Sequence, residues 1–164
     1  MNVYKTSQVR NVVFLGHGGA GKTTLAEAMA YATGVITRMG SVDNGNTISD
    51  YDSEEIKRKF SINAAVIPIE WNGLKINILD APGYFDFVGQ TEDAMSVADA
   101  AVIVVNGKAG LEVGTIKAWE ICERRKIPRI LFITGMDDPN AKYMETVKQL
   151  RKHLVNRLLR FICQ

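Results

Sequence analysis

The chain has 164 residues, a formal net charge of +2, 46% hydrophobic residues and 23% charged residues. This composition is typical of a globular domain with one sizeable core, and it excludes a disordered or fibrous chain. No apolar run of about 18 residues is present, so no membrane is expected as a partner. Residues 1–7 lack the apolar core of a signal peptide, and we therefore expect a cytoplasmic protein. In that compartment Cys122 and Cys163 are expected to stay reduced thiols.

The first third of the chain predicts a strand and a helix joined by a glycine-rich loop. Residues 9–15 form a short apolar run, as expected of a buried strand, and residues 22–33 are rich in helix formers. Gly34 is a typical residue at which a helix ends. Residues 35–61 are polar and charged, and we expect a mobile loop there.

Two further strands are predicted around a tight turn. Residues 62–71 and 74–79 are strand-like, and Asn72-Gly73 lies between them. Asn-Gly is the strongest two-residue hairpin signal, because both positions of a type I′ turn need a positive φ angle. The pattern therefore predicts a β-hairpin.

The remaining elements continue to alternate between strand and helix, which predicts an α/β fold. The apolar run 100–105 is typical of a buried parallel strand. A helix is predicted at residues 112–125, and a further strand at residues 129–134. From residue 140 to about 160, apolar residues recur at helical spacing. Residues 142–164 carry six Lys or Arg and one Glu. This charge fits contact with RNA or an acidic surface, and equally a solvated helix face.

The glycine-rich loop carries the first functional motif. The stretch Gly16-His17-Gly18-Gly19-Ala20-Gly21-Lys22-Thr23 matches the phosphate-binding pattern G-x-x-x-x-G-K-[S/T], with a predicted strand before it and a predicted helix after it. The glycines let the backbone aim N–H groups at phosphate oxygens, and the helix adds the positive end of its dipole. Lys22 is expected to reach the β- and γ-phosphates, and Thr23 to bind Mg²⁺ through its hydroxyl. His17 is expected to fill the loop and not to take part in the chemistry.

A second motif, Asp80-Ala81-Pro82-Gly83, follows directly on a predicted strand. An Asp at the carboxyl end of a strand beside a phosphate loop holds Mg²⁺, usually through water. Gly83 has no side chain that would keep its N–H group from a γ-phosphate. A simple turn is the alternative, and the position of the motif after the predicted hairpin favours the nucleotide site.

Three stretches that include these motifs, residues 10–24, 71–88 and 127–130, resemble the translational GTPases, most closely the elongation factor G family in its elongation factor G-like branch. The resemblance implies a P-loop NTPase three-layer sandwich with a mixed, mostly parallel sheet. It implies binding of GTP or GDP with Mg²⁺, the ribosome as a partner and no DNA partner. A switch I loop at 35–61 and a switch II segment at 81–93 are also implied.

The resemblance further implies that residues 1–164 form one GTP-binding domain. The last strand and helix of the family's GTPase domain, and its later domains, have no counterpart in this sequence. We therefore expect a C-terminally incomplete GTPase domain.

Individual residues take roles from the same resemblance. Ser61 stands where the family has a threonine that ligates Mg²⁺ in switch I, so the expected metal ligands are Thr23, Ser61 and Asp80. Tyr84 stands where most of the family has a histidine that positions the attacking water. A phenol with a pKa of about 10 orients water by hydrogen bonding but is no base at neutral pH. The alternative is that Tyr84 packs with its neighbouring phenylalanines over switch II.

The base-binding stretch departs from the family, which reads guanine with Asn-Lys-x-Asp. Here the residues are Thr134-Gly135-Met136-Asp137. Asp137 keeps a carboxylate that accepts two N–H bonds from guanine, whereas the supporting Asn and the Lys that packs on the base are absent. Guanine selectivity is therefore expected to be weakened.

Three hypotheses follow: a slow GTPase, a nucleotide-binding pseudo-enzyme without useful turnover, and a ribosome- or RNA-binding fragment. For the first, the expected catalytic residues are Lys22, Gly83 and Tyr84. The expected nucleotide contacts are Gly16, His17, Gly18, Gly19, Ala20, Gly21, Lys22, Thr23, Thr24, Asp80, Gly83, Thr134, Met136 and Asp137.

Overall fold

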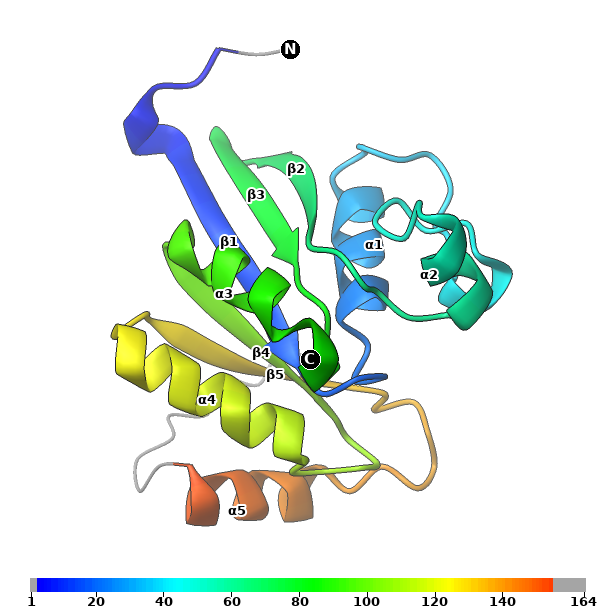
Figure 1. The fold of residues 1–164 in the computed structure, drawn as a ribbon, viewed down its shortest axis with the longest axis vertical. Coiled ribbons are helices and arrows are strands. Elements are labelled where there is room, and N and C mark those ends of the chain that lie inside the picture. The colour runs from blue at the N-terminus through cyan, green and yellow to red at the C-terminus, as the bar shows by residue number, and fades with distance from the viewer. Residues whose placement is uncertain (1–2, 155–164) are drawn as a thin grey trace.

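The computed structural model describes residues 3–154, which form a five-stranded sheet with helices on both faces (Figure 1). The strands lie in the order β2-β3-β1-β4-β5. Parallel pairing joins β1 (Val9–Gly16) to β3 (Leu74–Asp80) and β4 (Ala100–Asn106), and joins β4 to β5 (Arg129–Thr134). The edge strand β2 (Ala65–Trp71) is antiparallel to β3. The predicted α/β class and the mixed, mostly parallel sheet are confirmed.

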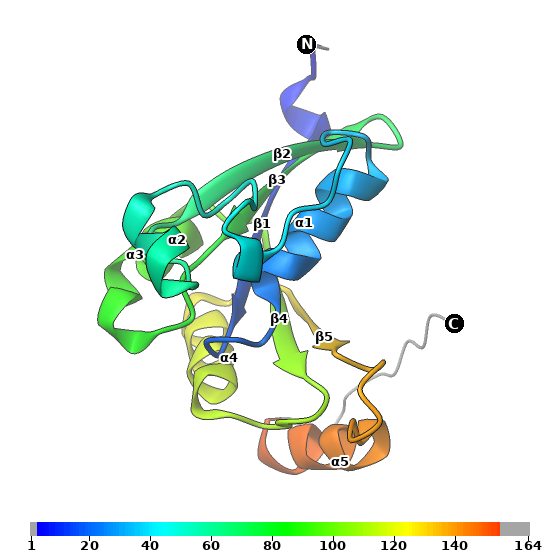
Figure 2. The same cartoon turned by 90° about the vertical axis from the view of Figure 1, so that its right-hand side faces the viewer.

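The helices make the outer layers of a sandwich. Their bounds are α1 (Lys22–Ala32), α2 (Ser53–Arg58), α3 (Val88–Ser96), α4 (Val113–Arg125) and α5 (Tyr143–His153). Figures 1 and 2 show α1 on one face of the sheet, α3 and α4 on the other, and α5 beyond the end of β5. Short 3₁₀ turns span Thr6–Gln8, Val42–Asn44 and Phe85–Phe87.

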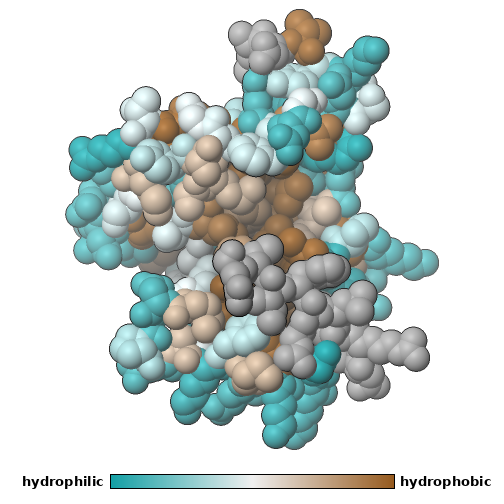
Figure 3. Space-filling view, turned by 180° about the vertical axis from the view of Figure 1, so that it is seen from behind, coloured by the Kyte–Doolittle hydropathy of each residue, from teal (hydrophilic) through white to brown (hydrophobic). Residues whose placement is uncertain are grey.

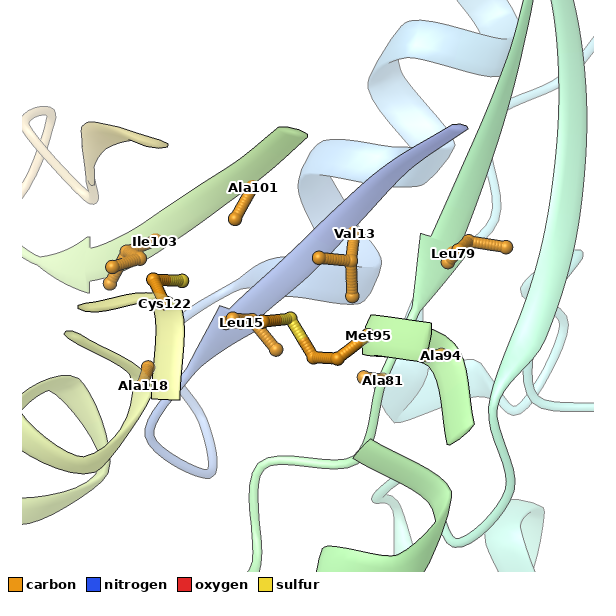
Figure 4. Close-up of a cluster of buried hydrophobic side chains, with 10 residues drawn as sticks. All are labelled: Val13, Leu15, Leu79, Ala81, Ala94, Met95, Ala101, Ile103, Ala118 and Cys122. Atoms are coloured by element: carbon orange, nitrogen blue, oxygen red, sulfur yellow. The ribbon is translucent and has the colours of Figure 1, made fainter. Parts of the chain in front are cut away.

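The apolar side chains of β1 alternate between the two faces of the sheet and so build two cores. Val13 and Leu15 lie in a buried cluster with Met95 of α3 and Cys122 of α4 (Figure 4). Phe14 points to the opposite face and packs with two alanines of α1. Full burial of such a side chain contributes about 1.5–3 kcal/mol, so the central strand holds both helical layers.

The cysteine prediction is confirmed for the residue that the structure describes. Cys122 is a free, buried thiol, and burial raises its pKa to about 11. A thiol in this state is inert as a nucleophile. Cys163 lies outside the described residues.

The hairpin prediction is confirmed, with one boundary corrected. Asn72 and Gly73 have φ angles of 47° and 75°, as a type I′ turn requires. The strand predicted to begin at residue 62 begins at Ala65. The N–H groups of Ile62 and Asn63 donate instead to the buried carboxylate of Glu55, which withdraws these residues from the sheet.

The polar segment 35–61, predicted as a loop, contains a 3₁₀ turn and α2. Asp52 caps α2 by accepting a hydrogen bond from the N–H group of Glu54, and Glu55 accepts one from the N–H group of Asp52. This reciprocal cap gives a six-residue helix two satisfied backbone donors. Helix α3 was not predicted either, because few apolar residues mark its buried side.

The helix predicted at 140–160 begins at Tyr143. Asp138 explains the delay, because its carboxylate and carbonyl accept hydrogen bonds from the N–H groups of Asn140 and Ala141 and form a turn there. The part of the prediction beyond residue 154, with two of the six Lys and Arg residues of the basic stretch 142–164, lies outside the described residues.

The outer strand β5 leaves apolar side chains on the surface. Ile130 and Phe132 of this strand are exposed. Seen from behind, apolar side chains gather in the middle of the molecule (Figure 3). None of the helices within residues 3–154 has the length and apolar character needed to cross a membrane.

Candidate functional site

Parallel pairing brings the carboxyl ends of the strands together at one edge of the sheet. Phe14 of β1 is in register with Asp80 at the end of β3, and Asn106 of β4 with Thr134 at the end of β5. The loops that follow these strands must therefore converge. Ligand sites of open α/β sheets lie in this place.

The glycine-rich loop turns tightly between β1 and α1. Gly16, Gly19 and Gly21 have φ angles of 142°, 78° and 92°, which L side chains rarely adopt. A Cβ atom on Gly16 would lie 2.3 Å from the carbonyl oxygen of Val104. The helix starts at Lys22, so its unpaired N-terminal N–H groups border the loop.

Lys22 is buried and already lies across this loop. Its ammonium donates to the carbonyl oxygens of Gly16 at 3.3 Å and His17 at 3.0 Å. Burial lowers the pKa of Lys22, and the nearby carboxylate of Asp80 opposes that shift. The imidazole of His17 lies 3.5 Å from the carboxylate of Glu112.

The three residues predicted to ligate a metal come together. The hydroxyl of Thr23 donates to Oδ2 of Asp80 at 2.7 Å, and the hydroxyl oxygens of Thr23 and Ser61 are 3.2 Å apart. Asp80 is fully buried, and burial raises its pKa to about 6 against the opposing effects of the Thr23 hydrogen bond and the charge of Lys22. A buried carboxylate that ionises reluctantly is poised to gain from a cation.

Two further oxygen-bearing side chains, Ser49 and Asp50, were missed by the sequence analysis. Oγ of Ser49, Oδ1 of Asp50 and Oδ1 of Asp80 are buried and make no hydrogen bond within 3.5 Å among residues 3–154, although Ser49 lies near enough to Asp80 to lower the pKa of its carboxyl. Burial also raises the pKa of Asp50. No pattern in the polar segment separates Asp50 from its acidic neighbours, so the sequence holds no signal for it.

This set of donors fits Mg²⁺. Hydroxyl and carboxylate oxygens are the ligands that this hard cation prefers, and it usually keeps waters and shares ligands with phosphates. Within residues 3–154 no group of three or more His, Cys, Asp or Glu forms a dedicated metal cluster.

Two buried glutamates fix the segment that carries Asp50 and Ser61. Glu27 of α1 accepts hydrogen bonds from the N–H groups of Gly40, at 2.9 Å, and Ile48. Glu55 holds the residues that directly follow Ser61, as described above. A carboxylate with two or three backbone donors is a strong anchor, because charged hydrogen bonds are about twice as strong as neutral ones.

Gly83 and Tyr84 close the opposite side of the site. A Cβ atom on Gly83 would lie 2.4 Å from Nζ of Lys22 and 2.8 Å from the backbone nitrogen of Gly18. Tyr84 is 42% exposed, and its ring centroid lies 4.7 Å from that of Phe60. Between these residues and the glycine-rich loop is a cleft of about 190 Å³, whose lining includes Lys22, Thr23, Thr24, Asp50, Ser61 and Tyr84.

The base-binding stretch is better supported than the sequence suggests. The hydroxyl of Thr134 donates to the carbonyl oxygens of Ala20 at 2.7 Å and Val105 at 3.2 Å. It therefore ties the end of β5 to the phosphate loop, so the expectation that this support is lost is wrong. Met136 and Asp137 are exposed beside it, and Gly135 has a φ angle of 64°.

This fold and this arrangement of lysine, hydroxyls and aspartate define a P-loop GTPase domain. The family model for the elongation factor Tu GTP binding domain matches residues 7–161. The chain belongs to this family, which binds guanine nucleotides, and it is a GTPase domain of the elongation factor G type.

Curated relatives and solved structures agree with this family. Mitochondrial ribosome-releasing factor 2 is 36% identical over 149 residues in Drosophila ananassae, covering 91% of this chain and 20% of the relative. The protein of that name from Meyerozyma guilliermondii is 38% identical over 159 residues, covering 97% of this chain and 19% of the relative. The chain thus spans about a fifth of the length of these relatives.

Among solved structures, a protein from Thermus thermophilus has a TM-score of 0.85 and 40% identity, over 89% of this chain and 22% of that one. Translation elongation factor SelB from Methanococcus maripaludis, solved with a GTP analogue, has a TM-score of 0.67 and 23% identity, over 93% and 27%. At 23% identity, the similarity to SelB shows a shared fold alone.

Proposed function

We propose that this chain binds GTP or GDP with Mg²⁺ and hydrolyses GTP slowly, as the G domain of an elongation factor G-like translation factor. The observation that carries the proposal is the meeting of Lys22, Thr23, Ser61 and Asp80 around the glycine-rich loop, with Tyr84 beside them. The names of the curated relatives support the ribosome as the partner.

The phosphates are placed against the loop of residues 16–21 and the first turn of α1. Backbone N–H groups of this loop donate to the phosphate oxygens, and the α1 dipole attracts their charge. Lys22 exchanges its carbonyl partners for the β- and γ-phosphates. Because its ammonium is already desolvated, little solvation is lost in this exchange.

We assign Thr23 and Ser61 as direct ligands of Mg²⁺, and Asp80 and Asp50 as acceptors for its bound waters. Mg²⁺ supplies positive charge that neutralises the β- and γ-phosphate oxygens during phosphoryl transfer. Ser61 belongs to the proposed switch I at 35–61. Its engagement is therefore the means by which a triphosphate closes this segment.

The hydrolytic step is assigned to the proposed switch II at 81–93. The N–H group of Gly83 donates to the γ-phosphate, and the hydroxyl of Tyr84 orients the attacking water. Phosphoryl transfer depends mainly on positioning and charge stabilisation, so a phenol without basicity suffices for slow turnover.

Removing the hydroxyl of Tyr84 tests this assignment. Tyr84→Phe keeps the ring and is expected to lower single-turnover GTP hydrolysis about tenfold, or roughly 1.4 kcal/mol of barrier. The affinity for GTP should remain within about threefold, since water orientation is not a ground-state contact. Hydrolysis and binding of GTP, GDP and ATP are measured with Mg²⁺ on the same preparations. Equal hydrolysis by the two forms would contradict the role of the hydroxyl.

For the base we assign Thr134, Met136 and Asp137 as the contacts. Thr134 anchors the loop, and Asp137 accepts the two N–H groups of guanine. Gly135 leaves one face of the base uncovered.

Restoring a lysine at position 135 is therefore expected to raise the preference for GTP over ATP about threefold, or roughly 0.7 kcal/mol. Gly135→Lys should also lower the free energy of unfolding by about 1 kcal/mol, because its φ angle of 64° disfavours an L side chain. Adding Thr134→Asn should bring no further gain, since the threonine already reaches Ala20. Competition binding of GTP and ATP to each variant measures this preference. A large further increase in the preference for GTP on adding Thr134→Asn would show that our account of Thr134 is wrong.

A nucleotide-binding pseudo-enzyme is the second candidate. Tyr84 in place of a histidine is the observation that favours it, because a phenol cannot share a proton at neutral pH. Tight GTP binding without measurable single-turnover hydrolysis would select this candidate. Cytoplasmic residence stays a prediction, since the curated relatives named above are mitochondrial proteins.

A further inference from the structure

Glu27 carries a carboxylate into the interior between α1 and the proposed switch I. Its side chain is 1% exposed, and each of its two oxygens accepts a hydrogen bond from a backbone N–H group, one from Gly40 at 2.9 Å and one from Ile48. The segment that carries both donors lies beside α1 in two perpendicular views (Figures 1 and 2). A buried carboxylate is costly without such donors, so the three groups hold one another in place. We call this arrangement the glutamate clamp.

The residues between the two donors form a loop that closes on itself. The N–H group of Ser41 donates to Oδ1 of Asn46 at 2.8 Å, and the N–H group of Asn46 donates back to the carbonyl oxygen of Ser41 at 3.4 Å. A Cβ atom on Gly40 would lie 2.3 Å from the carbonyl oxygen of Asn46, so the chain passes itself closely at this glycine. The glutamate clamp therefore holds a compact loop at both of its ends.

The second donor of the clamp, Ile48, lies two residues before Asp50. The carboxyl of Asp50 is buried and lies near enough to the hydroxyl of Ser61 for that group to lower its pKa. The charge of Asp50 in turn raises the pKa of Asp80. The backbone that the clamp holds thus carries Asp50 into the proposed Mg²⁺ site.

We propose that Glu27 is a positioning residue whose clamp seats Asp50 in the metal site before any nucleotide binds. Residues 40–50 of switch I then keep their place with GTP and with GDP, whereas Ser61 responds to the γ-phosphate. Groups that hold the outer acceptors of a metal site change metal affinity by about 10–100-fold when they are lost. The proposal rests on the proposed role of Asp50 as an acceptor for the waters of Mg²⁺.

Nucleotide binding at varied Mg²⁺ concentration tests the clamp. Glu27→Gln keeps the size of the side chain but turns one acceptor oxygen into an NH₂ donor, which cannot accept from a backbone N–H group. This variant is expected to raise the Mg²⁺ concentration for half-maximal binding of fluorescent GTP and GDP analogues about tenfold. Both analogues should be released faster by a similar factor. A change confined to the GTP analogue would overturn the proposal.

A double-mutant cycle shows whether Glu27 acts through Asp50. Asp50→Asn should also raise the Mg²⁺ requirement, and adding Glu27→Gln to it should bring little further change, since the group that the clamp positions is already altered. Glu54→Gln is the matched control, because this exposed carboxylate of the same segment binds only the side chain of Arg58. Losses that add fully in the double variant would overturn the proposal.

Amide hydrogen exchange of the nucleotide-free chain reports the clamp without any ligand. The amides of Gly40 and Ile48 are expected to be protected in the wild type and to exchange at least about tenfold faster in Glu27→Gln. The amide of Ile62, which Glu55 holds, should stay protected in both forms and so separates a local loss from unfolding. Unprotected Gly40 and Ile48 amides in the wild type would overturn the proposal, and this measurement needs no variant.

Failure of the clamp and failure of the proposed function look different. If the wild type binds GTP with Mg²⁺ and Glu27→Gln binds it with the same Mg²⁺ requirement, the clamp proposal is wrong and the proposed function stands. If the wild type binds no nucleotide at all, the proposed function is wrong. Faster exchange of the Gly40 and Ile48 amides in Glu27→Gln would then still support the clamp, and unchanged exchange would overturn it.

Discussion

Replacing Lys22 with alanine is expected to lower the affinity of the chain for GTP about a hundredfold, or roughly 3 kcal/mol. The ammonium is buried, faces the loop carbonyls of Gly16 and His17, and lies beside Asp80. In the complex it makes charged hydrogen bonds to two phosphates, each worth about 1.5–3 kcal/mol. Without it, the phosphate charge meets only backbone N–H groups and the helix dipole.

The measurement is a titration with a fluorescent GTP analogue in the presence of Mg²⁺. Lys148→Ala is the matched control, since Lys148 is exposed on α5 and far along the chain from the loop. Circular dichroism of the apo forms shows whether Lys22→Ala remains folded. An unchanged GTP affinity in folded Lys22→Ala would contradict the assignment of the phosphate loop.

The parts of the site that sequence predicts are those encoded by neighbouring residues. The phosphate loop and the Asp80-Ala81-Pro82-Gly83 motif are contiguous, and each follows a strand whose apolar pattern is clear. Parallel pairing of β1 and β3 then places the two motifs side by side. Local pattern and fold class were enough to predict that Lys22, Thr23 and Asp80 lie together at one edge of the sheet.

The parts that sequence could not predict depend on contacts between distant residues. Glu27 is one of many helix-forming residues in α1, and only the folded segment 35–61 shows that its carboxylate holds Gly40 and Ile48. Phe60 has no motif of its own, and its contact with Tyr84 joins two separate loops. At Thr134 the sequence shows only that the amide of the family is absent, whereas in the fold the threonine hydroxyl donates to Ala20 of the phosphate loop.

Asp80→Asn is expected to stabilise the nucleotide-free chain and to weaken its binding of Mg²⁺ and GTP. Burial raises the pKa of Asp80 from its ordinary value of 3.8 to about 6, so ionising this carboxyl in the folded state is costly. The folded form binds the proton more tightly than the unfolded form, so this contribution to stability is fully present below pH 3.8 and is lost as the pH rises through about 6. A rise of about two units in the pKa of Asp80 corresponds to a loss of at most roughly 3 kcal/mol in the free energy of unfolding at high pH.

Asparagine cannot ionise, and its carbonyl oxygen still accepts the hydrogen bond from Thr23. In urea unfolding without nucleotide, Asp80→Asn should therefore exceed the wild type by up to about 3 kcal/mol near pH 8, and the difference should vanish near about pH 4. With Mg²⁺ and GTP the order should reverse, because the wild type gains binding energy that the asparagine form largely lacks. If the free energies of unfolding of the two nucleotide-free forms changed with pH in parallel, ionising Asp80 in the folded state would not be costly, and the prediction would be wrong. A stabilising substitution that removes binding is the expected signature of a carboxylate kept in an unfavourable site for the cation it serves.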